Sequence, residues 1–99
     1  MDSSKEYQKY LKVVKVDGYD LRCVPKNFID EKMCLEAFRE GGEALKYVPE
    51  NLRDVHICQE AVKKNGFALE FVPIHLRDRE LCMESVKRNG SALKYVPEN

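Results

Sequence analysis

The sequence lacks an excess of charge of either sign, because its 17 lysines and arginines are balanced by 17 aspartates and glutamates. The overall charge therefore gives no reason to expect attraction to a nucleic-acid backbone or to an anionic membrane. Long apolar runs are also missing, so no segment is suited to span a bilayer or to form the core of a signal peptide. These absences predict a cytoplasmic protein.

Sustained alternation of apolar and polar residues, the pattern of a half-buried strand, is missing too. Glycine-rich phosphate-binding loops are also absent, since the glycines stand singly except for Gly41 and Gly42. The composition is nevertheless that of a folded chain, with 43% hydrophobic and 34% charged residues. A chain of 99 residues has room for one small domain, so residues 1–99 are expected to form a single domain.

What the sequence does contain is a repeat with a period of 24 residues. Successive copies begin at four glycines: Gly18, Gly42, Gly66 and Gly90. The repeat divides the chain into a half unit at 1–17, three units at 18–41, 42–65 and 66–89, and a partial unit at 90–99. A segment of this length cannot cover its own apolar side, so neighbouring units are expected to stack.

The first half of each unit predicts a short helix, and the second half predicts a longer one. In the short helix of the second unit, Ala44, Leu45 and Val48 lie on one side. This helix has barely two turns, because Pro49 cannot continue it.

The longer helix of the second unit has clear start and stop signals. Asp54 is placed to cap its first amides, and Lys63 and Lys64 stand in its last turn. Its apolar stripe consists of Ile57, Cys58, Ala61 and Val62. Asn65 and Gly66 supply a left-handed residue that ends the helix, so we expect a positive φ at Gly66.

Residues 1–17 repeat the pattern of the longer helix and predict an N-terminal capping helix. One face of this helix is formed by Tyr7, Tyr10, Leu11 and Val14. Together, the patterns predict an all-α fold: a short α-solenoid of 24-residue helix-turn-helix repeats.

The recurring motifs resemble a known family of helical repeats. They read N-G-x-A-L-x-x-V-P at residues 65–73, L-R-D at 76–78 and C-x-x-[AS]-V-K at 82–87. The pattern is similar to the family catalogued as domain of unknown function number forty-one-sixteen. This likeness covers residues 18–99, whereas residues 1–17 depart from it. The resemblance implies a bacterial or protist origin and a helical array often found inside larger proteins, but it implies no activity.

Three cysteines recur at the repeat period: Cys34, Cys58 and Cys82. Equivalent positions on stacked helices lie about 8 to 10 Å apart, beyond the Cα separation of about 7 Å that a disulfide allows. No C-x-x-C pair or nearby histidine completes a zinc site. We therefore expect buried packing residues, with no metal and no cofactor. Cys23 is close enough in sequence to approach Cys34, but no functional disulfide is expected there.

No arrangement of residues predicts catalysis, so we expect that the protein is not an enzyme. His56 falls on a polar helix position and His75 in a loop, in different columns of the repeat, so they form no pair. Three glutamates precede basic residues at a spacing that favours surface ion pairs over general acid-base work. The expected pairs are Glu36–Arg39, Glu60–Lys63 and Glu84–Lys87.

Basic residues cluster near the ends of the longer helices: Arg39, Lys63, Lys64, Lys87 and Arg88. With aromatic side chains as stacking platforms, they form a candidate site for single-stranded nucleic acid. Compensation of the helix dipoles explains the same residues. The second interpretation is favoured, because residues 42–65 and 66–89 each carry four positive and four negative charges. The N-terminal helix is locally basic, with Lys5, Lys9, Lys12 and Lys15.

The third unit departs most from the others. Phe67 and Ile74 place apolar side chains where the other units have mostly polar residues. With Phe71, and with Tyr47 and Tyr95 in the same column, they form a candidate partner-binding site. The alternative is that Phe67 and Ile74 pack against the neighbouring unit.

The function that these patterns favour is that of a non-catalytic helical-repeat module that binds a protein partner through an exposed face. Two alternatives stay open. One is a small mobile-element inhibitor of the anti-CRISPR kind that binds a nucleoprotein or RNA, and the other is a fragment of a larger scaffold or effector protein. For residues 90–99, we expect either fraying after about Gly90 or an end-to-end contact that forms a weak homodimer.

Overall fold

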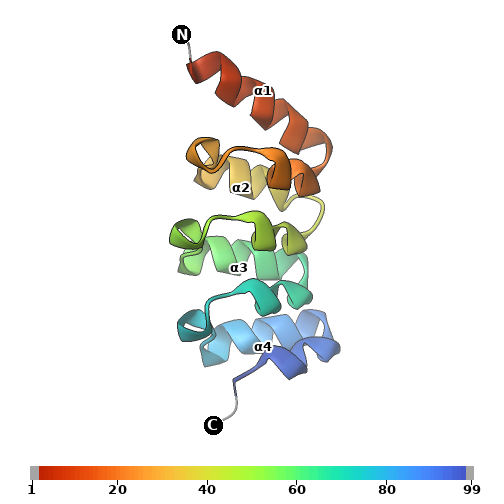
Figure 1. Cartoon of the computed structure of the whole chain (residues 1–99). Helices are drawn as coiled ribbons and strands as arrows, with labels where there is room; N and C mark the ends of the chain where they lie inside the picture. Colours follow the sequence, from red (N-terminus) through yellow and green to blue (C-terminus); the bar gives the residue numbers. More distant parts are fainter. Residues whose placement is uncertain (1–2, 98–99) are drawn as a thin grey trace.

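The computed structural model describes residues 3–97 as a stack of helices (Figure 1). The α-helices are α1 (Ser3–Val16), α2 (Glu31–Ala37), α3 (Val55–Lys64) and α4 (Arg79–Arg88). The 3₁₀ helices are η1 (Gly18–Cys23), η2 (Lys26–Phe28), η3 (Gly42–Tyr47), η4 (Glu50–Leu52), η5 (Gly66–Phe71), η6 (Ile74–Leu76) and η7 (Gly90–Tyr95). No strand occurs within residues 3–97, and the predicted all-α repeat fold is confirmed.

The helices form two layers that run the length of a stack measuring 51 × 23 × 17 Å. Figure 1 shows the 3₁₀ segments in front and α2, α3 and α4 behind them, with α1 at one end and η7 at the other. Within residues 3–97, every helix is too short or too polar to cross a bilayer.

The first half of each unit is a pair of 3₁₀ pieces, where the sequence predicts only one short helix. At the end of η3, the Val48 amide donates to the Leu45 carbonyl at 3.0 Å, the three-residue spacing of a 3₁₀ helix. Pro49 has no N–H and cannot extend this ladder. The chain therefore runs extended through Val48 and Pro49 before η4 begins.

An aspartate caps each of the three inner α-helices. Its Oδ1 atom accepts a hydrogen bond of 2.9 Å from the backbone amide three residues later: Asp30 from Met33, Asp54 from Ile57 and Asp78 from Leu81. The cap predicted at Asp54 is confirmed, and Lys63 and Lys64 lie in the last turn of α3 as predicted.

The left-handed residue predicted at the end of α3 is wrong. No glycine of the described chain has a positive φ, and Asn65 is extended with a φ of −158°. Gly66 is needed instead because a Cβ atom there would overlap the carbonyl oxygen of Ser85 on α4. Gly42 has the same relation to Ala61 on α3. These glycines therefore allow a 3₁₀ helix to lie directly against an α-helix.

Equivalent apolar residues of successive units are buried in columns. They include Leu21, Leu45 and Leu69, together with Cys34, Cys58 and Cys82. The cysteines are thus packing residues, as predicted. Since each fully buried leucine contributes about 1.5 to 3 kcal/mol, contact between units holds the stack together.

Helix α1 covers the first unit with the predicted face. Leu11 and Val14 are buried, while Tyr7 and Tyr10 are half-buried. The Tyr10 ring lies 5.3 Å from the ring of Phe28, centre to centre. Tyr7 Oη donates to Asp30 Oδ1 at 2.9 Å, and burial together with this hydrogen bond raises the pKa of Tyr7 to about 12.

Candidate protein-binding site on the 3₁₀ layer

Two arginines fix the backbone of the 3₁₀ layer. Arg53 donates from Nε to the Val48 carbonyl at 2.9 Å and from Nη2 to the Lys46 carbonyl at 3.1 Å. Its Nη1 atom donates to the Phe71 carbonyl of the next unit, also at 3.1 Å. One guanidinium therefore fastens the end of η3 to the end of η5. Its planar fork suits three acceptors better than a lysine ammonium does.

Arg77 repeats this arrangement one unit later. It donates to the carbonyls of Val72 at 2.9 Å and Glu70 at 3.0 Å, and across the junction to Tyr95 at 2.9 Å. Sequence analysis does not single out either arginine. The signal is nevertheless present, because L-R-D follows V-P at the same distance in both units.

The first unit has Ile29 at the position equivalent to Arg53. An isoleucine side chain has no donor, so the first junction lacks the guanidinium bonds of the other two. A groove of about 390 Å³ remains at this junction, and its lining includes Val24, Ile29 and Tyr47.

The arginines support a column of three aromatic residues, which we call the aromatic ladder: Tyr47, Phe71 and Tyr95. Each is the last residue of its 3₁₀ helix and is half-buried, with part of the ring packed against the core. Because Arg53 and Arg77 hold the carbonyls of Phe71 and Tyr95, the backbone under these rings is fixed. The structure thus brings together three of the five residues predicted for a partner-binding site.

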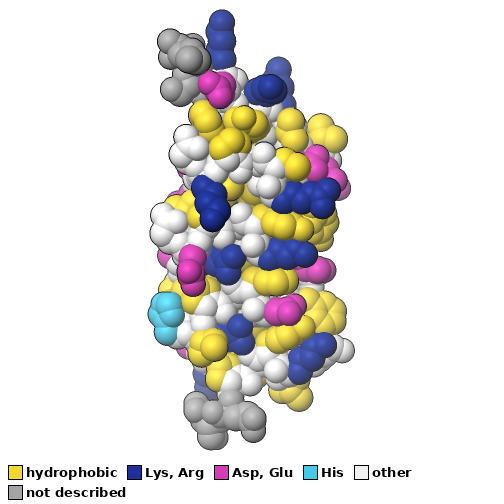
Figure 2. Space-filling view, in the orientation of Figure 1, with side chains coloured by type: hydrophobic (Ala, Val, Ile, Leu, Met, Phe, Trp, Pro, Cys, Tyr) yellow, Lys and Arg dark blue, Asp and Glu magenta, His cyan; other side chains and the backbone are white. Residues whose placement is uncertain are grey.

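Lysines lie over the rings of the aromatic ladder. Lys46 Nζ is 5.1 Å from the centre of the Tyr47 ring and 6.0 Å from that of Phe71, so it lies between two successive rings. Lys94 Nζ is 5.3 Å from the centre of the Tyr95 ring. Figure 2 shows apolar side chains alternating with charged ones of both signs on this face. The site is therefore amphipathic, with a cation beside an apolar ring.

The other two predicted residues, Phe67 and Ile74, do not lie side by side. Phe67 is near the start of η5 and half-buried, whereas Ile74 begins η6 and is 71% exposed. Figure 1 shows the long and the short 3₁₀ pieces of each unit on opposite sides of the stack. The predicted single patch therefore divides into the aromatic ladder and two flanking positions.

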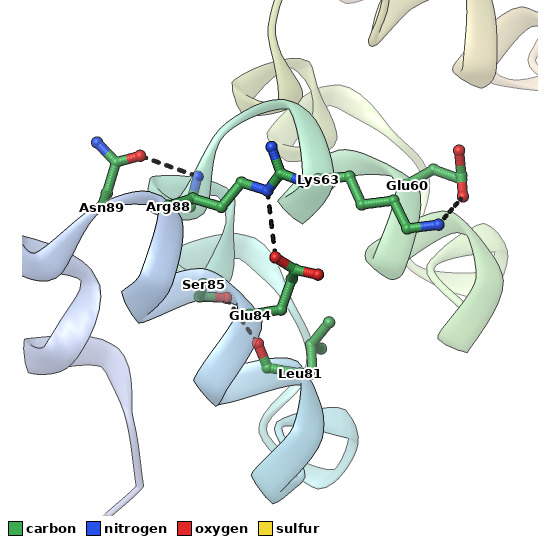
Figure 3. Close-up of polar contacts among 8 residues, drawn as sticks. Glu60, Lys63, Leu81, Glu84, Ser85, Arg88 and Asn89 are labelled. Carbon is green, nitrogen blue, oxygen red and sulfur yellow. Dashed lines mark hydrogen bonds and ion pairs between the residues drawn. The ribbon is translucent and has the colours of Figure 1, made fainter.

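The basic residues predicted for nucleic acid belong to the α layer or follow its helices directly, and several are paired with carboxylates. Arg39 lies 3.3 Å from Glu36. Lys63 lies 3.2 Å from Glu60, as Figure 3 shows. The predicted Glu84–Lys87 pair is wrong, because Glu84 binds Arg88 at 3.2 Å, one helical turn away at i, i+4. Lys64 and Lys87 are exposed. These cations and the aromatic ladder therefore lie on different elements.

The two histidines are exposed and apart, as the sequence suggests. His56 Nε2 lies 3.1 Å from Glu31 Oε1, an exposed contact between α3 and α2. His75 is in the short 3₁₀ helix η6 and not in a loop. No group of three or more histidine, cysteine, aspartate or glutamate side chains within residues 3–97 is arranged to hold a metal ion.

The three buried thiols, Cys34, Cys58 and Cys82, lie in environments that favour their protonated forms. Burial raises the pKa of Cys34 to about 12 and the pKa of Cys58 to about 11, and it also raises the pKa of Cys82. Cys23 is exposed while Cys34 is buried, and both are free thiols. A protonated thiol is a weak nucleophile, so the buried cysteines have a packing role.

Together, the stacked units and the aromatic ladder define a helical-repeat protein. The chain belongs to the family Domain of unknown function (DUF4116), whose sequence model matches residues 8–53, 30–77 and 54–99. The match at 54–99 begins at the capping aspartate of α3, and the three matches overlap along the stack. No curated protein matches the chain, and no solved structure matches it either.

Proposed function

We propose that the chain is a non-catalytic module that binds a protein segment along the aromatic ladder. The observation that supports this most directly is the column of half-exposed rings on a fixed backbone. Binding to such a surface orders few groups that are free beforehand, which lowers the entropic cost of association. The proposal places the module in the cytoplasm, where reduced thiols such as its buried cysteines persist.

An extended segment with an apolar residue at every third position fits the aromatic ladder. Stacked helices lie about 8 to 10 Å apart, and every third residue of a polyproline II segment recurs on one side after about 9 Å. Lys46 and Lys94 lie beside the rings and favour carboxylates in the flanking positions of the partner. Ile74 and Phe67 extend the contact on either side, beyond the ladder itself.

A nucleic-acid partner is less well supported. The aromatic rings on which bases would stack are in the 3₁₀ layer, whereas Lys63 and Arg88 are on α3 and α4 with carboxylates beside them. A single-stranded nucleic acid needs aromatic rings for its bases and basic side chains for its phosphates along the same groove.

The test is to select extended peptides from a display library on the immobilised chain and to measure their affinity for variants. Phe71→Ala should weaken binding about thirtyfold, the loss of about 2 kcal/mol typical of an aromatic anchor. Lys46→Glu should weaken the binding of peptides with acidic flanking residues more than that of other peptides. Gln59→Ala, an exposed change on α3, is the matched control and should have no effect. Thermal unfolding of each variant establishes that it is folded.

Two results would overturn the proposal. In the first, peptides selected on the chain bind equally well to Phe71→Ala. In the second, single-stranded RNA binds, its affinity falls steeply with salt, and changing Lys63, Lys64, Lys87 and Arg88 to alanine abolishes it.

A further inference from the structure

One end of the stack exposes residues that are buried in every earlier unit. Leu93 of η7 is 65% exposed, whereas the equivalent leucines are fully buried: Leu21, Leu45 and Leu69. Val96 is half-buried, but Val72, its equivalent in the preceding unit, is only 1% exposed. We call this surface, formed by Gly90, Leu93 and Val96, the C-terminal face.

The C-terminal face borders an apolar groove between α4 and η7. Its volume is about 530 Å³, and its lining includes Cys82, Met83, Val86, Leu93 and Val96. Met83 is 55% exposed there. Charged residues stand at the rim, among them Arg79 and Lys87. A groove with an apolar floor and a charged rim suits an amphipathic helix.

Gly90 shows what kind of element is missing from this face. In the earlier units, Gly18, Gly42 and Gly66 lie against backbone carbonyls of the α-helix that follows in the same unit. A Cβ atom on Gly90, by contrast, would have no neighbour within 4 Å. The space that an α-helix fills three times in this chain is therefore open beside η7.

The C-terminal face is already formed, and η7 is held in place. Arg77 Nη1 donates to the Tyr95 carbonyl at 2.9 Å, as Arg53 does to the Phe71 carbonyl. The Val96 amide also donates to the Leu93 carbonyl at 3.1 Å. A partner helix therefore meets a surface that needs no further ordering.

The three helices that fill the equivalent space share a sequence signature. Each has a capping aspartate, a bulky apolar residue three positions later and a small residue seven positions later. The sets are Asp30, Met33 and Ala37; Asp54, Ile57 and Ala61; and Asp78, Leu81 and Ser85. The last two residues of each set are buried, and the backbone of the small residue contacts the glycine.

We infer that the C-terminal face binds the α-helix of a further repeat with the signature Asp-x-x-bulky apolar-x-x-x-Ala or Ser. The bulky residue packs on Leu93 and Val96, and the small residue lets the helix approach Gly90. The inference does not depend on the proposed function, because the aromatic ladder lies on another surface of the stack.

Helix α1 of a second copy of this chain does not match the signature. At the corresponding positions, α1 has Lys9 in place of Ile57 and Val13 in place of Ala61. Burying the Lys9 ammonium without a partner is costly, and the larger Val13 crowds the approach to Gly90. The matching helix is therefore that of another repeat, and not the one with which this chain begins.

The test extends the full chain after Asn99 with a copy of residues 52–65, which continues the 24-residue register. The thermal midpoint should rise by about 5 °C or more, the shift expected when a small domain gains a packed helix. Hydrogen exchange at the Val96 amide should slow at least about tenfold, because the face becomes covered.

The matched control carries the same extension with lysine in place of the copied Ile57 and valine in place of the copied Ala61. These are the two departures found in α1, and they should abolish both gains. Equal stabilisation by the two extensions, or by neither, would overturn the inference. So would a dimer of the unextended chain that Leu93→Lys converts to monomer in sedimentation equilibrium, since the occupant would then be a second copy.

Discussion

Arg77 and Tyr95 are joined across the last junction of the stack, with the arginine Nη1 atom 2.9 Å from the tyrosine carbonyl oxygen. The same guanidinium also binds the carbonyls of Val72 and Glu70 in its own unit. The side chain that holds two units together is thus the one that fixes the backbone beneath an aromatic ring. Stability of the stack and geometry of the candidate site depend on the same residue.

Removing this arginine should weaken the whole stack. Arg77→Ala is expected to lower the free energy of unfolding by about 1.5 to 3 kcal/mol, the contribution of hydrogen bonds from a charged group. Arg77→Lys should not restore it, because one ammonium cannot reach all three carbonyls. Urea denaturation measures both changes. Arg79→Ala, an exposed change on α4, should remain within about 0.5 kcal/mol, and an equal loss in this control would contradict the assignment.

Two glycines that look alike in sequence should respond differently to alanine. At Gly66 the new Cβ atom would overlap the Ser85 carbonyl oxygen, so Gly66→Ala should cost about 1 to 3 kcal/mol. At Gly90 the same atom meets nothing within 4 Å, so Gly90→Ala should be neutral or slightly stabilising. Thermal unfolding of the two variants compares them directly. Similar midpoints would show that close approach is not the reason for the glycine.

The flanking residues Phe67 and Ile74 should tolerate glutamate. Ile74 is 71% exposed, so Ile74→Glu should change the free energy of unfolding by less than about 0.5 kcal/mol. For Phe67→Glu, the second unit provides a precedent, since Glu43 accepts a hydrogen bond of 2.7 Å from Asn65 Nδ2. Asn89 is the equivalent of Asn65 in the third unit.

Circular dichroism and urea denaturation of the double variant, which carries both Phe67→Glu and Ile74→Glu, check this expectation. Leu69→Glu provides the contrast, because Leu69 is fully buried and a charge there should unfold the chain. If the double variant also unfolds, Phe67 and Ile74 belong to the core, and neither flanks a binding site.

The buried thiols should make the stack sensitive to alkali. Burial raises the pKa of Cys34 to about 12 and that of Cys58 to about 11, so the folded chain favours their protonated forms. In the unfolded chain a thiol loses its proton near its ordinary pKa of about 8.5. The stabilisation from the thiols is therefore complete below about pH 8.5 and is lost as the pH rises toward 11 and 12.

Urea midpoints measured between about pH 7 and 11 test this, with Cys34→Ala and Cys58→Ala as controls that should flatten the alkaline part of the profile. A thiol reagent at neutral pH should modify Cys23 quickly and the other three cysteines only after unfolding. Fast modification of Cys34 in the folded chain would contradict its burial.

Reductant and chelator should leave the thermal midpoint unchanged, because the cysteine columns pack and do not ligate. Differential scanning calorimetry with and without each reagent measures this. A fall of many degrees with either one would assign the cysteines to a bridge or a metal site.

The periodic features of the fold could be predicted from the sequence, because they recur. The 24-residue period, the cap at Asp54 and the stripe from Ile57 to Val62 each have one physical interpretation. The 3₁₀ character of the first half-unit could not be predicted in the same way. The spacing of Ala44, Leu45 and Val48 fits either helix type, and η1 is a 3₁₀ helix even though Ile29 replaces the arginine there, so no single side chain decides the outcome.

The candidate site was only partly predictable for a related reason. Tyr47, Phe71 and Tyr95 share a column, which the repeat makes visible in the sequence. The roles of Gly66 and Arg77 depend on contacts with distant residues. A glycine after asparagine is common at left-handed helix ends. Here the glycine is required because a Cβ atom would overlap the Ser85 carbonyl oxygen on another element.

The isoleucine of the first unit bears on how the chain opens. In a linear array, each unit interacts only with its neighbours, so the cooperativity of unfolding depends on the strength of each junction between units. The second and third junctions each have a guanidinium bond to the backbone of the next unit, but Ile29 leaves the first junction without one, and the exposed His56–Glu31 contact is a weaker link there. We therefore expect the thermal fluctuations that part neighbouring units to concentrate at the first junction. With Arg53 and Arg77 bridging its junctions, the block of residues 42–97 is expected to stay together when residues 3–41 come away from it.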